Sequence, residues 1–521
     1  GSAPDGRYTG VLTATGGGTS IRTPVALTKE VESYDVPVKV LDRAGRPTPN
    51  YFFRFVDIDH PKAYFPYDPS GTVVARLPKG RFYFEGFVQT RIGPGEFDLD
   101  LTELFEPNLV VSGPRPAPLD ARRGKPLGIA LDRPAASSLA EFDSFLTTTW
   151  GETGTGVIGS NFDGVFVASS VTVAPPGKYT FSVFEVAARP DGHGGFDRSP
   201  YLYQVGWTQP DRVPSVLVRH LGDGALAART HQFGGPVPGA IGLFGGAVTR
   251  PLPGAVTVLS TPGIAFFQDL VEFTPTGDFG TDQLGNGTAL SRPGPAGSEK
   301  WNLPVFGPGF PSGPATGIFV GRLGEEIGAE IPLFSDQNPT HFGFSQADGS
   351  TRLFKDGQLV GEEQVPGFID VLVPAGAGVF RLETEATRTV SPLSTRVSAV
   401  WTFRSGSVPG EPVALPLAAV RFAPVVDDRG RPPAGRRLLP VPVLVQRQAG
   451  GGFGQLAGLT VQASFDDGMT WQPVPLAGAG DRRTAMVRQP AGPGFVSLRA
   501  TATDRAGNSV QQTIIRAYVL R

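Results

Sequence analysis

The chain has 521 residues, of which 46 are Lys or Arg and 48 are Asp or Glu, so that its formal net charge is −2. Such a balanced charge gives no electrostatic reason to expect nucleic acid or an anionic membrane as a partner. No apolar run approaches the roughly 20 residues needed to span a bilayer, and the lack of cysteine excludes disulfides, thiolate metal sites and cysteine nucleophiles.

Glycine and proline are spread along the whole chain. There are 70 Gly and 51 Pro, yet 40% of the residues are hydrophobic and 36 are Phe. The apolar residues alternate in short runs between Gly, Pro and Asp turns, which is typical of hairpin-rich β-proteins. We therefore expect an all-β fold built from tandem immunoglobulin- or fibronectin-like β-sandwich domains.

The first predicted element is a hairpin within residues 1–33. The stretches "PDGRYTGVLTAT" and "TSIRTPVALTKE" predict two strands that are joined at Gly16–Gly18. Ile21, Val25 and Leu27 would then share one face of the second strand. We expect this hairpin to be what is left of a truncated fibronectin-like sandwich, either packed on the next domain or left with an exposed edge.

The turn of this hairpin overlaps part of a catalytic signature. Gly18, Thr19 and Ser20 match the start of G-T-S-M-A-x-P, the sequence around the nucleophile of subtilisin-like serine peptidases. That nucleophile begins a helix, whereas Ile21 and the residues after it favour a strand. No aspartate or histidine motif accompanies Ser20, and a hydroxyl without a base is not an activated nucleophile. We therefore assign Ser20 to the hairpin and no catalytic role to the chain.

A repeated turn motif marks later strands. The pattern P-x-G-x-[Tyr/Phe], or a looser form of it, precedes alternating strands that begin after Pro4, Pro78, Pro175, Pro374 and Pro490. Proline and glycine restrict the turn, and the aromatic side chain is expected to enter a core. With a weak match at Pro275, the spacing from Pro78 onward is about 100 residues, the size of one immunoglobulin-like sandwich.

These motifs and the composition breaks predict six segments. They are a terminal hairpin of a truncated fibronectin-like sandwich (1–33), a sandwich similar to carboxypeptidase regulatory domains (34–112), a sandwich (113–212), a β-rich domain (213–297), a sandwich (298–407) and a C-terminal immunoglobulin-like sandwich (408–521). Within the third segment, "SSLAEFDSFLTTTW" has helical spacing of its apolar residues, but the threonines that follow favour a strand.

The stretch "SFDDGMTW" fits the Asp-box pattern S-x-D-x-G-x-T-W. Its specified residues are Ser464, Asp466, Gly468, Thr470 and Trp471. Asp466 can accept backbone N–H bonds across the turn, Gly468 permits a left-handed residue, and Trp471 can pack beneath them. A single copy inside a sandwich indicates a structural hairpin, with sugar contact by Trp471 as the alternative.

No metal or cofactor site can be assigned from the sequence. The five histidines form no close pair of the kind that binds zinc. Asp57, Asp59 and His60, and likewise Asp191 and Asp197, form turn-like clusters with the oxygen ligands that calcium prefers, but neither is a complete calcium-loop motif. Calcium therefore stays unassigned, and solvated loops are the simpler interpretation.

Several segments resemble one protein family. "TRLFKDGQLVGEE", "PLSTRVSAVWTFRS", "SFDDGMTWQPV" and "AGPGFVSLRATATDRAGNSVQQTIIRAYVLR", with "GVLTATGGGTSIRTPVALTKEVESYDV" and "LDARRGKPLGIAL" upstream, resemble the C-terminal region of large secreted bacterial subtilisin-like serine peptidases. The resemblance implies a secreted protein whose catalytic domain lies N-terminal to this region. Because the triad motifs are missing here, it carries over no catalytic residue.

The resemblance implies a non-catalytic accessory region that stabilises or positions the subtilase domain in cis and can recruit protein substrates. Two alternatives remain open. One is an extracellular array that binds glycan or the cell surface through exposed Trp471, Trp207 or Trp301. The other is an enzyme of another type, such as a glycosidase, which would require two carboxylates about 5–10 Å apart in one cleft.

Overall fold

The structure is a computed structural model that describes residues 4–95, 98–117 and 119–520. Nearly every element is a strand, and the described helical elements are two 3-10 turns, η1 (Ala121–Arg123) and η2 (Asp223–Ala225). Neither turn approaches the length and apolarity that a membrane-spanning helix requires, among the residues described. The predicted class, an all-β chain of tandem β-sandwiches, is confirmed.

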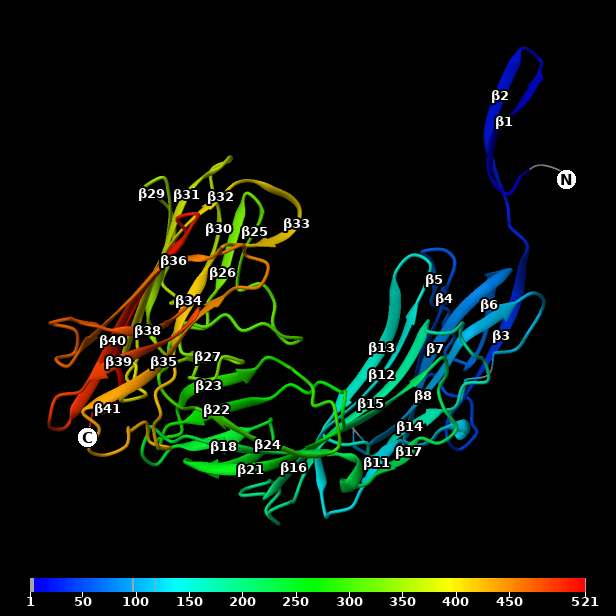
Figure 1. Cartoon of the computed structure of the whole chain (residues 1–521). Coiled ribbons are helices and arrows are strands. Elements are labelled where there is room, and N and C mark those ends of the chain that lie inside the picture. Colours follow the sequence, from blue (N-terminus) through cyan, green and yellow to red (C-terminus); the bar gives the residue numbers. More distant parts are fainter. Residues whose placement is uncertain (1–3, 96–97, 118, 521) are drawn as a thin grey trace. The chain divides into compact units, whose positions relative to one another are not determined.

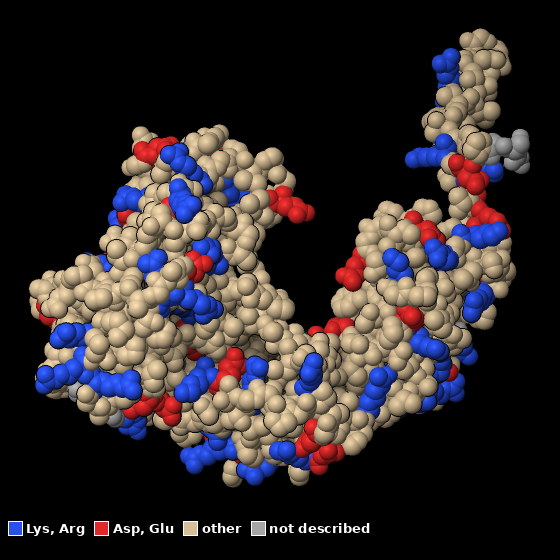
Figure 2. Space-filling view, viewed as in Figure 1, with Lys and Arg blue, Asp and Glu red and all other residues tan. Residues whose placement is uncertain are grey.

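The contacts divide the chain into two compact units. Unit 1 comprises residues 1–132, 137–186 and 205–222, and unit 2 comprises 133–136, 187–204 and 223–521. On the face shown in Figure 2, basic and acidic side chains are interspersed over the surface of both, in keeping with the near-zero net charge.

Unit 1 begins with the hairpin of β1 (Gly6–Gly16) and β2 (Thr19–Lys29), drawn in dark blue in Figure 1. Gly17 and Gly18 form its two-residue turn with φ of +59° and +83°, values that a residue with a side chain rarely adopts. The predicted turn and strands are therefore present, and Ser20 lies on β2 opposite Thr15.

One face of this hairpin is apolar and open to solvent. The strand register places five large apolar residues on it, each between 39% and 68% exposed: Tyr8, Leu12, Ile21, Val25 and Leu27. The predicted shared face of the second strand is thus confirmed. Of the two arrangements expected for the hairpin, the structure has the exposed one.

The rest of unit 1 contains three sheets. The first has the order β6 (Thr72–Pro78), β3 (Ser33–Leu41), β9 (Leu119–Asp120). The second has the order β10 (Lys125–Pro126), β14 (Val165–Ala168), β8 (Leu99–Val111), β7 (Gly80–Arg91), β4 (Tyr51–Asp57), β5 (Ala63–Tyr64). The third has the order β13 (Glu152–Gly159), β12 (Ala136–Thr147), β15 (Tyr179–Ala188), β16 (Tyr201–Pro210), and a parallel pair, β11 (Gly128–Leu131) and β17 (Val218–Leu221), stands beside them.

The second sheet is buried on both faces. Alternate residues of β7 enter different cores: Phe82 and Phe84 pack in one with Val38 of β3, whereas Tyr83 packs in the other with Phe142 of β12. A strand covered on both sides needs apolar residues at successive positions, which explains the run "RFYFEGFV". The segment whose apolar residues have helical spacing is strand β12, as the threonines at its end indicated.

The predicted boundary between residues 112 and 113 does not separate two sheets. Strand β14 pairs in parallel with β8 in the second sheet, with Val165 opposite Leu101. The two sandwiches expected at 34–112 and 113–212 therefore share this sheet as a common wall, because β14 completes a sheet begun by the preceding segment.

Unit 2 begins with two sheets. In the first, Tyr201–Gln204 of β16 pairs with β21 (Gly254–Ser260), which is followed by β18 (Ala227–Phe233) and β24 (Gly294–Trp301). The second has the order β20 (Val248–Pro251), β19 (Ile241–Phe244), β22 (Asp269–Phe273), β23 (Phe279–Gly285), β27 (His341–Ser345). The expected boundary at 297/298 lies inside β24, because this strand pairs with β18 over its whole length.

Three more sheets complete unit 2. One has the order β29 (Gln358–Glu363), β28 (Asp348–Lys355), β31 (Gly378–Thr387), β32 (Arg396–Ser405), β41 (Ser509–Leu520), β40 (Gly494–Asp504), β36 (Leu456–Ser464), β37 (Gln472–Val474). Another has the order β30 (Phe368–Leu372), β26 (Glu326–Glu330), β25 (Val320–Gly324), β33 (Val408–Ala414). The last has the order β34 (Ala418–Phe422), β35 (Leu438–Arg447), β39 (Arg482–Arg488), β38 (Leu476–Ala479).

A single hydrophobic core runs through these three sheets. It includes residues from Val305 to Leu520, with Trp401 buried among them. Strand β32 pairs with β41, with Trp401 opposite Val510. The expected boundary at 407/408 therefore does not divide two cores, since strands from both sides of it lie next to each other in one sheet.

The repeated turn motif does mark strand starts. Strands β1, β7, β15, β31 and β40 begin within a few residues of Pro4, Pro78, Pro175, Pro374 and Pro490. The aromatic residue of the motif is buried at three of these places, where it is Phe82, Tyr179 and Phe380. Tyr8 differs, because its hairpin has no core to enter.

Candidate functional site

The Asp-box turn connects β36 to β37 and is held by its own polar side chains. Asp466 Oδ1 accepts hydrogen bonds from the Ser464 hydroxyl at 2.7 Å and the Thr470 N–H at 2.9 Å, and the Gly468 N–H donates to Ser464 Oγ at 2.9 Å. The Thr470 hydroxyl and N–H lower the pKa of Asp466 to about 2. Gly468 has φ +89°, and the Trp471 indole N–H donates to its carbonyl at 2.9 Å. Each polar group of the motif thus serves the turn itself.

The tryptophans named for sugar binding are not exposed platforms. Trp207 and Trp301 are buried, at 5% and 1% exposure. Trp471 is half-buried, and the Arg499 guanidinium lies 4.1 Å from its ring centroid. The expectation of exposed aromatics is therefore wrong for Trp207 and Trp301, because both fill cores, as tryptophans in sandwiches usually do.

The carboxylates of the turn-like acidic clusters already bind hydrogen-bond donors of the protein itself. Asp57 Oδ1 accepts the N–H groups of Asp59 and His60, and Asp59 is paired with Arg81 at 2.5 Å. Asp191 accepts three backbone N–H groups within its own loop. Among the described residues no group of three or more His, Asp or Glu is placed to hold a metal ion.

A buried charged cluster lies inside unit 2, where β24, β18 and the start of β27 meet. His341 Nδ1 lies 3.0 Å from Asp336 Oδ2, and its Nε2 lies 3.4 Å from Glu299 Oε1. Its ring stacks on Trp301 with 3.8 Å between centroids, and the Trp301 N–H donates to His231 Nδ1 at 2.9 Å. His341, His231 and Asp336 are each 0% exposed.

The cluster holds its histidines in opposite protonation states. Burial lowers the pKa of His341, but the carboxylates of Asp336 and Glu299 outweigh it and raise this pKa to about 9. Burial opposes ionisation of Glu299, yet His341 lowers its pKa to about 2. Burial lowers the pKa of His231 to about 3. At neutral pH His341 is therefore a cation bound between two anions, and His231 is neutral.

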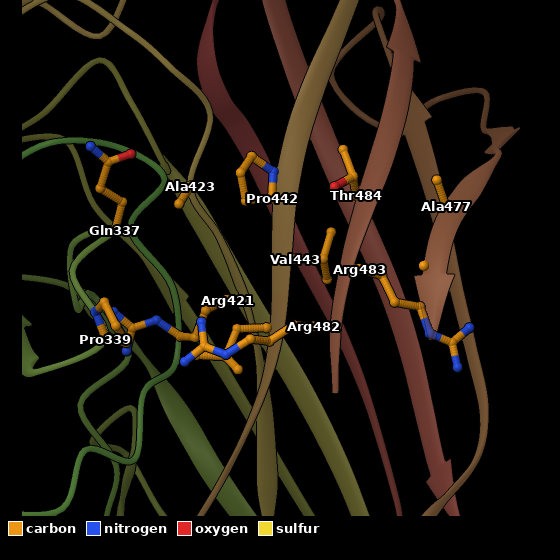
Figure 3. Close-up of a pocket in the computed structure, with 12 residues that line it drawn as sticks. Gln337, Pro339, Arg421, Ala423, Pro442, Val443, Ala477, Arg482, Arg483 and Thr484 are labelled. Atoms are coloured by element: carbon orange, nitrogen blue, oxygen red, sulfur yellow. The ribbon is translucent and has the colours of Figure 1, made fainter. Parts of the chain in front are cut away.

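A pocket of about 450 Å³ lies on the outer face of the β34–β35–β39–β38 sheet. The register places Arg421 opposite Leu444 and Leu444 opposite Arg482, so these three side chains share a face. Figure 3 shows Arg421 and Arg482 extending toward the same side of the pocket, whereas Arg483 extends away from them.

The loop that contains Gln337 and Pro339 forms the other wall of this pocket. Arg421 and Gln446 attach the loop to the sheet: Arg421 Nη2 donates to the Asn338 carbonyl at 3.0 Å, and Gln446 Nε2 donates to the Pro339 carbonyl at 2.7 Å. The wall of the pocket is thus held by hydrogen bonds to residues that also line or adjoin it.

Neither the charged cluster nor the pocket was expected from the sequence. The residues of each site come from several strands and loops that together span more than a hundred positions, 231–341 for the cluster and 337–484 for the pocket, and the sequence around each has no motif. The one local signal is the pair of Asp336 and His341, five residues apart in "DQNPTH", a spacing with no established meaning on a loop. The predicted residues Ser20 and Trp471 lie in neither place.

Comparisons with known proteins add little to this description. No family model and no curated protein sequence matches the chain. Among solved structures, the human desmocollin-1 ectodomain aligns over 93% of this chain and 97% of its own, with 10% identity and a TM-score of 0.14. Escherichia coli alpha-2-macroglobulin activated by porcine elastase aligns over 99% of this chain and 52% of its own, with 9% identity and a TM-score of 0.14. Such scores carry no argument, and the class of the protein, an all-β array of sandwiches, rests on its own strands.

Proposed function

We propose that the chain is the non-catalytic accessory region of a secreted subtilisin-like serine peptidase, where it stabilises and positions the catalytic domain and offers a surface for protein substrates. The segments of the sequence that resemble that family support the proposal. They include strands β28, β29, β32, β37, β40 and β41, six of the eight strands of the largest sheet of unit 2.

The proposal that the chain is not catalytic is supported by the burial and protonation of His341 beside Asp336. An acid next to a histidine is two-thirds of a serine-peptidase triad. Here both ring nitrogens of His341 face carboxylates, and the side chain is buried and protonated. A general base must be neutral and reach its substrate. His341 instead links β27 to Glu299 of β24 and to the loop that contains Asp336.

The test uses the native protein from its source. Culture medium would be treated with a fluorophosphonate that labels active serine hydrolases, and polypeptides that contain this chain would be isolated with an antibody against unit 2. We expect a labelled polypeptide whose modified serine lies outside residues 4–520. Label on Ser20 or another serine of this chain, or an unlabelled polypeptide, would contradict the proposal.

A further inference from the structure

The pocket on the outer face of the β34–β35–β39–β38 sheet contains a buried cation without an anion. Arg421 is 4% exposed, and it forms no ion pair with any residue in the described part of the chain. Its hydrogen bonds go to neutral acceptors, namely the carbonyls of Asp336 and Asn338 and the side-chain oxygen of Gln446. A guanidinium has five N–H donors, so Nε–H and one Nη1–H have no acceptor among the residues that the structure describes.

An unpaired buried charge is costly. Burial lowers the pKa of Arg421 to about 10, so that the side chain is still a cation at neutral pH. The carboxylate that lies nearest in the cluster, Asp336, is already paired with His341. Among the described residues no carboxylate forms an ion pair with Arg421, although the charge of Asp336 favours the protonated guanidinium.

A second guanidinium lies on the same face. Arg482 is exposed, forms no ion pair among residues 4–95, 98–117 and 119–520, and stands two strands from Arg421. Strands spaced at about 4.8 Å place their backbones about 10 Å apart, a gap that two long side chains can close around one anion. None of the residues that line the pocket is acidic.

The remaining lining is mostly apolar. Pro339 forms one wall, and Pro442, Leu444 and Ala477 form the floor beside the arginines. The volume, about 450 Å³, falls within the range of pockets that hold small organic ligands. An inorganic anion would leave this apolar surface uncovered, whereas an anion on an apolar carrier would cover it.

We propose that this pocket is a binding site for a carboxylate carried on an apolar group. Arg421 and Arg482 bind the carboxylate, since a guanidinium matches its two oxygens with parallel N–H donors. Pro442, Leu444 and Ala477 contact the apolar carrier. The carboxylate can belong to an acidic residue of a peptide or to a free acid. This site goes beyond the proposed function and does not depend on a peptidase being attached.

Calorimetric titration of the whole chain tests the site with two acids and their neutral counterparts. The acids are hexanoate and acetyl-Leu-Leu-Glu-amide, and the controls are hexanamide and acetyl-Leu-Leu-Gln-amide. We expect saturable binding of an acid that added NaCl weakens, and no binding of the amides. Binding of both acids, of the peptide only or of hexanoate only would support the site and identify the source of the carboxylate.

Two variants on one strand provide the matched comparison. Arg482→Gln removes a cation that faces the pocket, and Arg488→Gln removes an exposed cation on the same strand, β39, that does not line the pocket. We expect at least about tenfold weaker binding for Arg482→Gln, the loss of one charge-assisted hydrogen-bonding group, and nearly unchanged binding for Arg488→Gln. Ala477→Trp, which fills the pocket, should abolish binding while thermal unfolding stays unchanged.

Three results would overturn the proposal. They are no binding of either acid at millimolar concentration, equal binding of acids and amides, and equal weakening by Arg482→Gln and Arg488→Gln. Because both substitutions leave the core packing intact, each variant is expected to fold, and circular dichroism checks that it does.

Discussion

Replacement of His341 by glutamine removes the cation of the buried cluster and leaves its anions in place. In the native protein His341 contacts Asp336 and Glu299 from opposite ring nitrogens and stacks on Trp301. Glutamine keeps the hydrogen-bonding capacity and much of the volume, but it carries no charge. The variant therefore isolates the electrostatic part of the interaction.

The magnitude follows from the shift in the pKa of His341. A folded-state pKa of about 9 against an ordinary value of about 6.5 corresponds to about 3 kcal/mol of stability. The lowered pKa of Glu299 describes the same ion pair from its other side, so the two are not added. Removal of one partner from a buried pair commonly costs about 3–5 kcal/mol, which agrees in size.

The sign gives the prediction its pH dependence. A histidine whose pKa is raised by folding contributes its full stabilisation below about pH 6.5, and this contribution is lost as the pH rises through about 9. The free energy of unfolding of the wild type should therefore exceed that of His341→Gln by about 3 kcal/mol at pH 6, and this difference should shrink toward zero above pH 9. Acids with raised pKa values, such as Glu272 at about 7, affect both proteins alike and cancel from the difference.

Amide hydrogen exchange of peptides from β24 and β27 measures the difference, because it reports local free energies of opening even when the two units unfold separately. His193→Gln, at an exposed loop histidine, is the matched control and should leave exchange unchanged. A difference between wild type and His341→Gln that stays constant from pH 6 to pH 10, or one that grows with pH, would refute the assignment of His341 as a buried cation.

Two further substitutions test the packing. Trp401→Ala should lower the free energy of unfolding by about 3–5 kcal/mol and raise amide exchange in both β28 and β35, because Trp401 lies in one core that extends across residue 407. An increase in exchange on one side only would contradict a shared core. Trp150→Ala, at an exposed tryptophan, is the control. Gly86→Ala should cost about 1–3 kcal/mol by overpacking, since a Cβ there would lie 2.5 Å from Phe53 Cβ. Thermal unfolding of both variants measures this: Gly113→Ala, where a Cβ would meet nothing within 4 Å, should be nearly neutral, and equal effects of the two substitutions would contradict the packing described for β7.

Local patterns in the sequence predicted local features of the fold. Alternation of apolar residues predicted strands throughout, and β12 forms where threonines outweighed a helical spacing. The turn motif located the starts of β7, β15, β31 and β40. Gly16–Gly18 predicted the first turn correctly. In each case neighbouring residues suffice, because turns and strand faces depend on backbone preferences over a few positions.

Partners of strands could not be predicted in this way. β8 pairs with β14 and β32 with β41, across the expected boundaries at 112/113 and 407/408. A proline-rich break in composition predicts a loop, but a loop can also connect two strands of the same sheet. The choice between a new domain and a return to an old sheet depends on which edges are left unpaired, and this is a property of the assembled sheets.

The candidate sites divide along the same line. The sequence alone determined that the chain forms strands, that it has no cysteine chemistry and that Asp466 and Gly468 form a turn, because composition and short-range hydrogen bonds decide these features. Only the tertiary structure decided that His341 lies between Asp336 and Glu299, and that Arg421 and Arg482 face one pocket. Charge pairing and burial depend on strands that are distant in the chain and adjacent in space, and their register is set by packing of the whole unit.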